Sequence, residues 1–268
     1  MKRILLGLAF IIAIIGGAFL GYKLMGEVEV QNHTGKSRVF VTGNIHGELD
    51  IEKLNEDVFQ EQKKLTKDDN LIIIGDFGLI WDGNIKDEMI LDNLNNRGFN
   101  ILFVDGAHEN FDMLYEYEEV TIYGGRAHKI RDNIFHLIRG EVYTIGGKKF
   151  VVFGGGESTD KKFREEGISY WKEEIPSNDD WTNLKNNIEK HNYYIDYVLT
   201  YTPPTSDLRF IGAEIGTNLG SGNEISAKLE NIFSTVKYKK WYHSYYHVDM
   251  ELSEKHINIY NNVVEINK

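Results

Sequence analysis

Cysteine is absent from this chain of 268 residues, and proline is scarce, with only three residues. Without cysteine the chain forms no disulfide, no thiolate metal site and no cysteine nucleophile. That absence fits an oxidising compartment without requiring one. Hydrophobic residues make up 41% of the chain, which is an ordinary composition for a packed globular protein of one large domain or two small ones.

Positive charge is also in short supply. The chain has 30 Lys and Arg residues against 41 Asp and Glu residues, and three of the basic residues lie in 1–26, so the rest carries 27 against 41. A surface of this sign repels phosphate backbones and anionic lipid headgroups. We therefore expect no nucleic-acid partner. Solubility alone is the alternative explanation of the charge.

One apolar run, from Ile4 to Leu20, is long enough to span a bilayer and follows Lys2 and Arg3. The positive-inside rule then places the amino terminus in the cytoplasm and the rest of the chain outside. A cleaved signal peptide is the alternative, but the run is long for one and no Ala-x-Ala site follows. We expect residues 1–26 to be a cytoplasmic start and single-pass membrane anchor, 27–37 a tether, and 38–268 the functional domain.

Three apolar runs each end in glycine followed or preceded by polar side chains. The runs lead into Gly43-Asn44-Ile45-His46-Gly47, into Gly75-Asp76-Phe77-Gly78, and into Asp105-Gly106-Ala107-His108-Glu109. Short β-branched runs with such endings are typical of buried strands that present polar residues at their carboxyl ends. Helical spacing of apolar residues in 50–65 and 87–97 predicts a helix after each of the first two strands. This alternation predicts a parallel sheet.

The remainder of the chain predicts further strands and helices. Short runs over 120–123, 127–130, 134–138, 142–145 and 149–153 predict antiparallel strands, with a turn at Gly146-Gly147. Helices are expected over 179–190 and 225–233, and strands over 197–200, 240–242 and 256–260. The carboxyl ends of the strands are the expected location of a ligand site.

In order along the chain, these motifs resemble those of the calcineurin-like metallophosphoesterases. Two later motifs continue the resemblance, Thr200-Tyr201-Thr202-Pro203-Pro204 and Trp241 to His247. The chain is most similar to a compact bacterial branch with Gly-Asp-Phe-Gly and a triple glycine, here Gly154-Gly155-Gly156. The resemblance implies an α/β fold, a four-layer α/β/β/α sandwich of two mixed sheets, preceded here by one transmembrane helix.

The resemblance also implies two metal positions. The first would be held by Asn44, His46, Asp76 and His247, where Asn44 replaces the family's aspartate. Asn44 can still offer a carbonyl oxygen, and two histidines with a carboxylate suit zinc, iron or manganese. The sequence is consistent with a single divalent ion at this site. It is equally consistent with no ion, in which case the polar residues would bond to one another.

The second metal position would share Asp76 with three further positions, which here hold Ala107, Tyr201 and Tyr245. Alanine has no ligand atom, and phenols with a pKa near 10 stay neutral. We therefore expect no complete dinuclear centre and expect the tyrosines to fill the volume or bond to Asp76. His243, two residues before Tyr245, could reach this position only after a shift of register.

His108 matches the family's general acid, although it could equally be retained for packing. Such an acid supplies about 10²- to 10⁴-fold and cannot replace a nucleophile generated by a metal. Gly154-Gly155-Gly156 could bring amides to a phosphate or could form a tight turn, and Arg126 and Arg139 could hold an anion or form ion pairs.

Two functions follow from these residues. The first is a membrane-anchored, catalytically inactive phosphoesterase-like protein with a binding or regulatory role, with a protein partner at the cleft closed by Tyr201 and Tyr245. The second is a divergent phosphomonoesterase or phosphodiesterase that uses one metal and His108.

Overall fold

The computed structural model describes residues 37–266 as an α/β protein with two mixed sheets. The first sheet has the order β13 (Val264–Glu265), β1 (Val39–Thr42), β2 (Asn70–Ile74), β3 (Asn100–Val104), β6 (Ile134–Leu137), β5 (Gly125–Arg131), β4 (Glu119–Ile122). The second has the order β11 (Met250–Glu251), β12 (His256–Asn258), β10 (Lys240–His243), β9 (Tyr197–Thr200), β8 (Lys148–Phe153), β7 (Val142–Ile145).

Each sheet has a parallel centre and antiparallel edges. Strands β1, β2, β3 and β6 run parallel in the first sheet, and β12, β10, β9 and β8 run parallel in the second. The hairpins predicted after residue 120 are confirmed by the antiparallel pairs β4 with β5, β5 with β6, and β7 with β8. The central strands are buried on both faces, as expected for parallel strands covered on each side.

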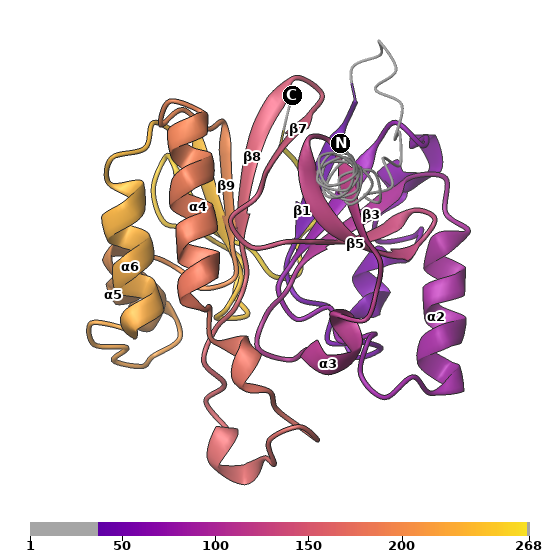
Figure 1. Cartoon of the computed structure of the whole chain (residues 1–268), viewed down its shortest axis with the longest axis horizontal. Coiled ribbons are helices and arrows are strands. Elements are labelled where there is room, and N and C mark those ends of the chain that lie inside the picture. Colours follow the sequence, from indigo (N-terminus) through magenta and orange to yellow (C-terminus); the bar gives the residue numbers. More distant parts are fainter. Residues whose placement is uncertain (1–36, 267–268) are drawn as a thin grey trace, which may run out of the picture.

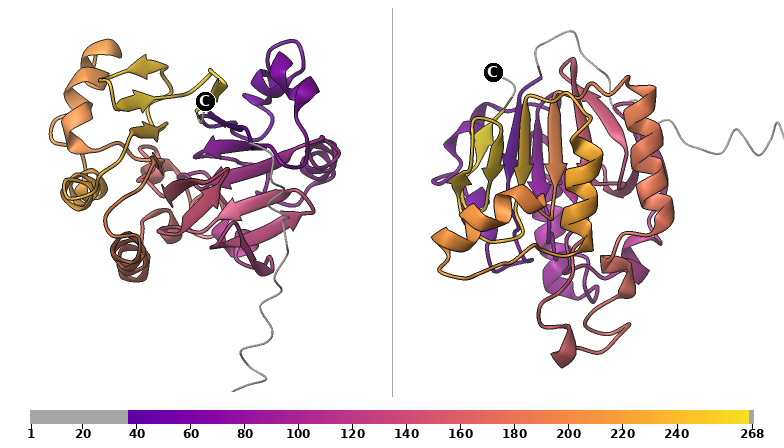
Figure 2. Two further views of the ribbon diagram at one scale, coloured as in Figure 1. Left: turned by 90° about the horizontal axis from the view of Figure 1, so that it is seen from above. Right: turned by 90° about the vertical axis from the view of Figure 1, so that its left-hand side faces the viewer.

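The two sheets pack face to face, and helices cover their outer faces (Figures 1 and 2). One apolar cluster lies between the sheets and includes Ile72 and Val104 from the first and Val152 and Leu199 from the second. Helices α2 (Ile85–Asn95) and α3 (Phe111–Leu114) lie on one side, and α4 (Asn178–Lys190), α5 (Thr205–Glu214) and α6 (Glu224–Phe233) on the other. Each outer layer has its own apolar cluster.

The helix predicted over 50–65 is wrong. Two 3₁₀ helices, η1 (Ile51–Leu54) and η2 (Gln60–Lys64), stand there instead. The carbonyl of Leu54 accepts hydrogen bonds from the side chains of Gln62 (3.0 Å) and Arg97 (2.7 Å), so it has no bond from the amide four residues on. That amide, of Val58, bonds to Asn55 instead, and the Val58 side chain is 59% exposed.

Other boundaries moved by a few residues. Helix α2 begins at Ile85 because the side chain of Asn84 accepts a hydrogen bond from the amide of Asp87 and caps the helix. Helix α5 and the short strands β11 and β13 were not predicted. Between β8 and α4 the chain forms a long excursion with η3 (Lys161–Phe163) and η4 (Lys172–Glu174), which projects beyond the end of the sheets (Figures 1 and 2).

The predicted anchor (1–26) and all but the last residue of the predicted tether (27–37) lie outside the described residues. Among helices within 37–266, none combines the length and the apolar composition needed to cross a membrane.

Candidate functional site

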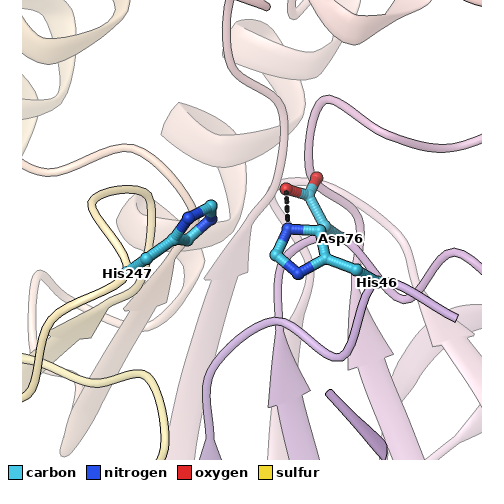
Figure 3. A group of neighbouring side chains, drawn as sticks. All are labelled: His46, Asp76 and His247. Carbon is cyan, nitrogen blue, oxygen red and sulfur yellow. Dashed lines mark ion pairs between the residues drawn. The ribbon is translucent and has the colours of Figure 1, made fainter. Parts of the chain in front are cut away.

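The motif residues meet where loops at the carboxyl ends of strands from both sheets come together. Asn44 and His46 follow β1, and Asp76 follows β2, all in the first sheet. His247 follows β10 of the second sheet and faces the other two side chains across the junction (Figure 3). One potential ligand atom from each of His46, Asp76 and His247 lies within 4.8 Å of the others, the geometry of a possible metal cluster. The sequence prediction that these residues converge is therefore confirmed.

The backbone at all three of these residues is left-handed, with φ of 45° at His46, 23° at Asp76 and 47° at His247. Side chains with a Cβ rarely adopt this conformation, which costs on the order of 1 to 3 kcal/mol for each residue. Such strain persists only where the surrounding structure imposes it, and it concentrates at functional sites. The loops thus hold the three side chains in a fixed arrangement at some cost in backbone conformational energy.

His46 lies between two carboxylates. Its Nδ1 is 2.6 Å from Oδ2 of Asp50, and its Nε2 is 3.3 Å from Oδ2 of Asp76. Burial would lower the pKa of His46, but hydrogen bonds to Asp76 and Asp50 outweigh it and raise the pKa above its ordinary value. A carboxylate behind the far nitrogen is the usual way to orient a metal-binding histidine. Sequence reasoning missed Asp50, although its place four residues after His46 was a signal.

Asn44 is completely buried, and its amide nitrogen lies between two of the cluster residues. Nδ2 donates to Oδ2 of Asp76 at 3.0 Å and lies 3.0 Å from Nε2 of His247. Because an amide NH₂ is only a donor, Nε2 of His247 accepts this bond with its lone pair. The side-chain carbonyl oxygen of Asn44, Oδ1, is buried and has no partner among the described residues. The amide therefore bridges the two side chains that a cation would otherwise bridge.

Asp76 is saturated with hydrogen bonds. Its Oδ1 accepts the amides of Ala107 (2.7 Å) and His108 (2.9 Å), and its Oδ2 accepts Asn44 and the hydroxyl of Tyr201 (2.7 Å). A carboxylate has about four lone-pair positions, so these four donors use them all. His46 and His108 also approach Oδ2 at 3.3 Å. Burial alone would raise the pKa of Asp76, but hydrogen bonds from His108 and His46 outweigh it and hold the pKa well below its ordinary value.

Tyr201, one of the residues expected at a second metal position, is part of the core. It is 3% exposed, and its ring packs so closely on Gly75 and Gly156 that a Cβ at either glycine would lie within 2.7 Å of a ring carbon. The prediction that this tyrosine bonds to Asp76 is confirmed. Tyr245 instead donates its hydroxyl to the backbone carbonyl of Glu157 at 2.6 Å, with its ring 5.1 Å from that of Tyr201.

His108, the expected general acid, is blocked at its outer nitrogen. A guanidinium nitrogen of Arg164 forms a very short contact with Nε2 of His108. Arginine stays protonated and only donates, so Nε2 must accept, and the ring proton lies on Nδ1, 3.3 Å from Asp76. Arg164 is itself fixed by Asp160 (2.8 Å) and by the carbonyl of Ser169 (3.0 Å). In this arrangement His108 has no proton to give from Nε2.

Two buried ionisable residues support the site from behind and were not singled out in the sequence. Glu109 accepts the amides of Phe77 (2.6 Å) and Gly78 (3.2 Å), which fixes the loop that follows Asp76. Burial, with the charge of Asp76, raises the pKa of Glu109 well above its ordinary value. Lys53 donates to the backbone carbonyl of Asn44 at 2.5 Å, and burial lowers the pKa of Lys53 to about 8. Neither side chain reaches the cluster itself.

Three other predicted possibilities lie elsewhere. His243 is fully buried and bonds to Asp207 and Asn258, so the register shift toward the second metal position is wrong. The amides of Gly155 and Gly156 donate to the backbone carbonyls of Asp105 and Glu174, so they are not available to a phosphate, and the segment forms no tight turn. Arg139 forms a buried ion pair with Asp105, and Arg126 pairs with Glu141.

A cavity of about 260 Å³ opens beside the cluster. Its lining includes Ala107, His108, Tyr201, Tyr245 and His247. Three tyrosine rings and the methyl group of Ala107 give this cavity a mainly apolar surface, although Glu157, Ser158 and Thr159 also line it, and such a lining suits an apolar or aromatic group better than a hydrated ion.

Comparison with known proteins adds no assignment, since no protein-family model and no curated protein matches this chain.

Proposed function

We propose that this chain is a membrane-anchored protein on a calcineurin-like phosphoesterase scaffold, an α/β/β/α sandwich, that has lost dinuclear catalysis and serves a binding or regulatory role. Two observations of the described residues support the scaffold: two mixed sheets packed face to face, and motif residues that meet at the carboxyl ends of the strands. The anchor proposed for residues 1–26 would hold the domain on the extracytoplasmic face.

The observation that carries the loss of catalysis is the hydrogen bonding of Asp76. A bridging carboxylate in a two-metal hydrolase gives its lone pairs to two cations, which activate water and neutralise the transferring oxygens. Here the lone pairs are taken by two backbone amides, the Asn44 amide and the Tyr201 hydroxyl. The N–H and O–H groups stabilise the carboxylate in place of the cations. Unlike a bound cation, they cannot generate a nucleophile from water.

The cavity beside the cluster is the proposed docking position for a partner. Tyr245 and Tyr246 contribute half-buried rings with centroids 4.8 Å apart, and the cavity they border is open to solvent. Tyrosine is favoured at interfaces because it buries a large area while fixing few torsion angles. An aromatic or apolar side chain of a partner protein would complete this ring cluster.

A hydrolase with one metal is the second candidate, and the orphaned carbonyl of Asn44 favours it. Rotation of the amide would point this oxygen at Asp76, which is favourable only with a cation between them. Asn44, His46, Asp76 and His247 would then hold the ion, which would supply an activated water. His108 could act as an acid in this hydrolase only after Arg164 had moved away.

The test is metal content and activity of the full-length chain, purified in a nonionic detergent. The protein is incubated with manganese, zinc or iron, freed of loose ions, and assayed for bound metal and for hydrolysis of aryl phosphate monoesters and diesters. Asp76→Ala is the inactive reference, and Asp57→Ala, an exposed site that is not part of the cluster, is its matched control.

We expect no bound metal. We also expect any background hydrolysis to be the same in the parent and in Asp76→Ala. One metal per chain, lost in both His46→Ala and His247→Ala, with activity lost in parallel, would replace the first proposal with the second. Two metals per chain would contradict both proposals.

A further inference from the structure

A second cleft, separate from the candidate site, lies between the edge of the first sheet and the beginning of α4. Its volume is about 420 Å³, and none of its lining residues lines the cavity beside Asp76. Strands β4, β5 and β6 form one wall, and η4 with the first turns of α4 forms the other. A pocket of this size falls in the range of small-ligand sites.

The charge that lines this cleft is mostly negative. Five carboxylates, those of Asp105, Glu119, Glu173, Asp179 and Asp180, face two guanidinium groups, those of Arg126 and Arg139. Both guanidinium groups already form an ion pair with a carboxylate. Arg139 donates to Asp105 through Nε (2.9 Å) and Nη2 (2.5 Å), and Arg126 donates to Glu141 at 2.8 Å.

Two further carboxylates form longer ion pairs with the same arginines. Glu119 is 3.6 Å from Arg126, and Asp180, which also caps α4 through Ser177, is 3.6 Å from Arg139. No partner is recorded for the carboxylate of Glu173 among the described residues, and this side chain is half-buried. The cleft therefore keeps a surplus of negative charge after its internal ion pairs are counted.

A buried histidine adds an unpartnered acceptor. His128 is 9% exposed and lines the cleft. Nε2 of His136 donates to Asp105 at 3.1 Å, and Nδ1 of His136 lies 3.0 Å from Nδ1 of His128, so one proton is shared between the two rings. In the tautomer with this proton on Nδ1 of His128, Nε2 of His128 carries a lone pair. Nε2 has no partner among the described residues and faces the cleft.

The arrangement favours an organic cation over a metal ion. The only group of three or more ligand atoms found close together within 37–266 is the cluster of His46, Asp76 and His247, so the carboxylates of this cleft are too dispersed to enclose one ion. The ring of Tyr115 also lines the cleft, 5.7 Å from that of His128 by centroids. An aromatic face beside carboxylates is a recognised setting for ammonium and guanidinium groups.

We propose that this cleft binds an alkylammonium or guanidinium group, with N–H donors directed to Nε2 of His128 and to the carboxylates of Glu119 and Glu173. The group belongs either to a free polyamine-like molecule or to a Lys or Arg side chain of another protein. The beginning of α4 does not oppose this assignment, because its capping box and Asp179 already compensate the helix dipole. The proposal is independent of whether metal binds at Asp76.

Calorimetric titration of the full-length chain in nonionic detergent tests this proposal. The probes are 1,4-diaminobutane and a capped Gly-Arg-Gly peptide. Glu173→Gln and His128→Phe each remove one proposed acceptor, and Glu214→Gln, an exposed acid on α5, is the matched control. Because each acceptor bonds a charged donor, we expect either change to weaken binding roughly tenfold or more, and the control to leave it unchanged.

The two probes distinguish the sources of the cation. Tighter binding of the peptide would assign a protein side chain, and tighter binding of the diamine would assign a free amine. Failure of both probes to bind at millimolar concentration would overturn the proposal, as would binding that Glu173→Gln does not weaken. Inorganic phosphate or Mg²⁺ bound in place of either probe would overturn it as well. Glu173→Gln changes a partly exposed side chain, so the test stands even where His128→Phe unfolds the protein.

Discussion

Replacing Asn44 with aspartate adds a second carboxylate to the cluster of His46, Asp76 and His247. In the metal-free protein the new carboxylate would stand about where the Asn44 amide now lies, 3.0 Å from Oδ2 of Asp76. Two full charges at that distance repel by roughly 5 kcal/mol at an effective dielectric constant near 20. Protonation of one of them limits this cost to about 4 kcal/mol at pH 7, given an ordinary pKa near 4.

The same change removes the amide bond to His247, which contributes about 1 kcal/mol. We therefore expect Asn44→Asp to lower the free energy of unfolding by about 3 to 5 kcal/mol without metal. At 2 to 4 °C for each kcal/mol, the midpoint of thermal unfolding would fall by roughly 6 to 20 °C. A divalent ion at a hundred times its dissociation constant should return about 2.7 kcal/mol of this loss.

The assay is thermal unfolding followed by tryptophan fluorescence, for the full-length chain in EDTA and in manganese or zinc. Asn133→Asp is the matched control, because Asn133 is also buried, donates its amide to the carbonyl of Phe99 at 2.8 Å and leaves its Oδ1 without a partner. The control should lose stability with no recovery in metal. Metal-free Asn44→Asp as stable as the parent, or a parent stabilised by metal to the same extent, would refute the reasoning.

Three further outcomes follow from single contacts. Tyr201→Phe removes one donor to a buried carboxylate and should cost about 1 to 3 kcal/mol in urea unfolding, so a change below 0.5 kcal/mol would contradict the bond to Asp76. Arg164→Gln should allow a proton on Nε2 of His108, and long-range ¹H–¹⁵N spectra would detect the change of tautomer; an Nε2 proton already present in the parent would contradict the contact. Burial lowers the pKa of His128 to about 3, so the unfolded chain takes up a proton at this residue as pH falls from about 6.5 while the folded chain does not. The free energy of unfolding therefore falls by about 1.4 kcal/mol for each pH unit between about 6.5 and 3, and His128→Phe should make this dependence on pH less steep. Equal slopes in parent and variant would contradict the lowered pKa of His128.

The strands could be predicted because their signals are local. Runs such as Leu71 to Ile74 are apolar without interruption, and glycine with polar residues marks where each run ends. The helix expected over 50–65 failed partly for a reason that lies outside the segment. The Leu54 carbonyl that this helix needs accepts bonds from Gln62 and from Arg97, which is distant in sequence, and Val58 of the expected apolar face is exposed.

The sequence by itself determined which side chains reach the site. The positions of the motifs at the ends of apolar runs place Asn44, His46, Asp76 and His247 at one junction, and the lack of a charged ligand atom at Ala107, Tyr201 and Tyr245 is visible in their chemistry alone. Only the tertiary structure decided which partners these groups hydrogen-bond to. The pairing of Asn44 with both Asp76 and His247, the arginine on His108 and the acidic cleft beside α4 each depend on loops far apart in the chain, whose relative positions are fixed by packing that no local pattern records.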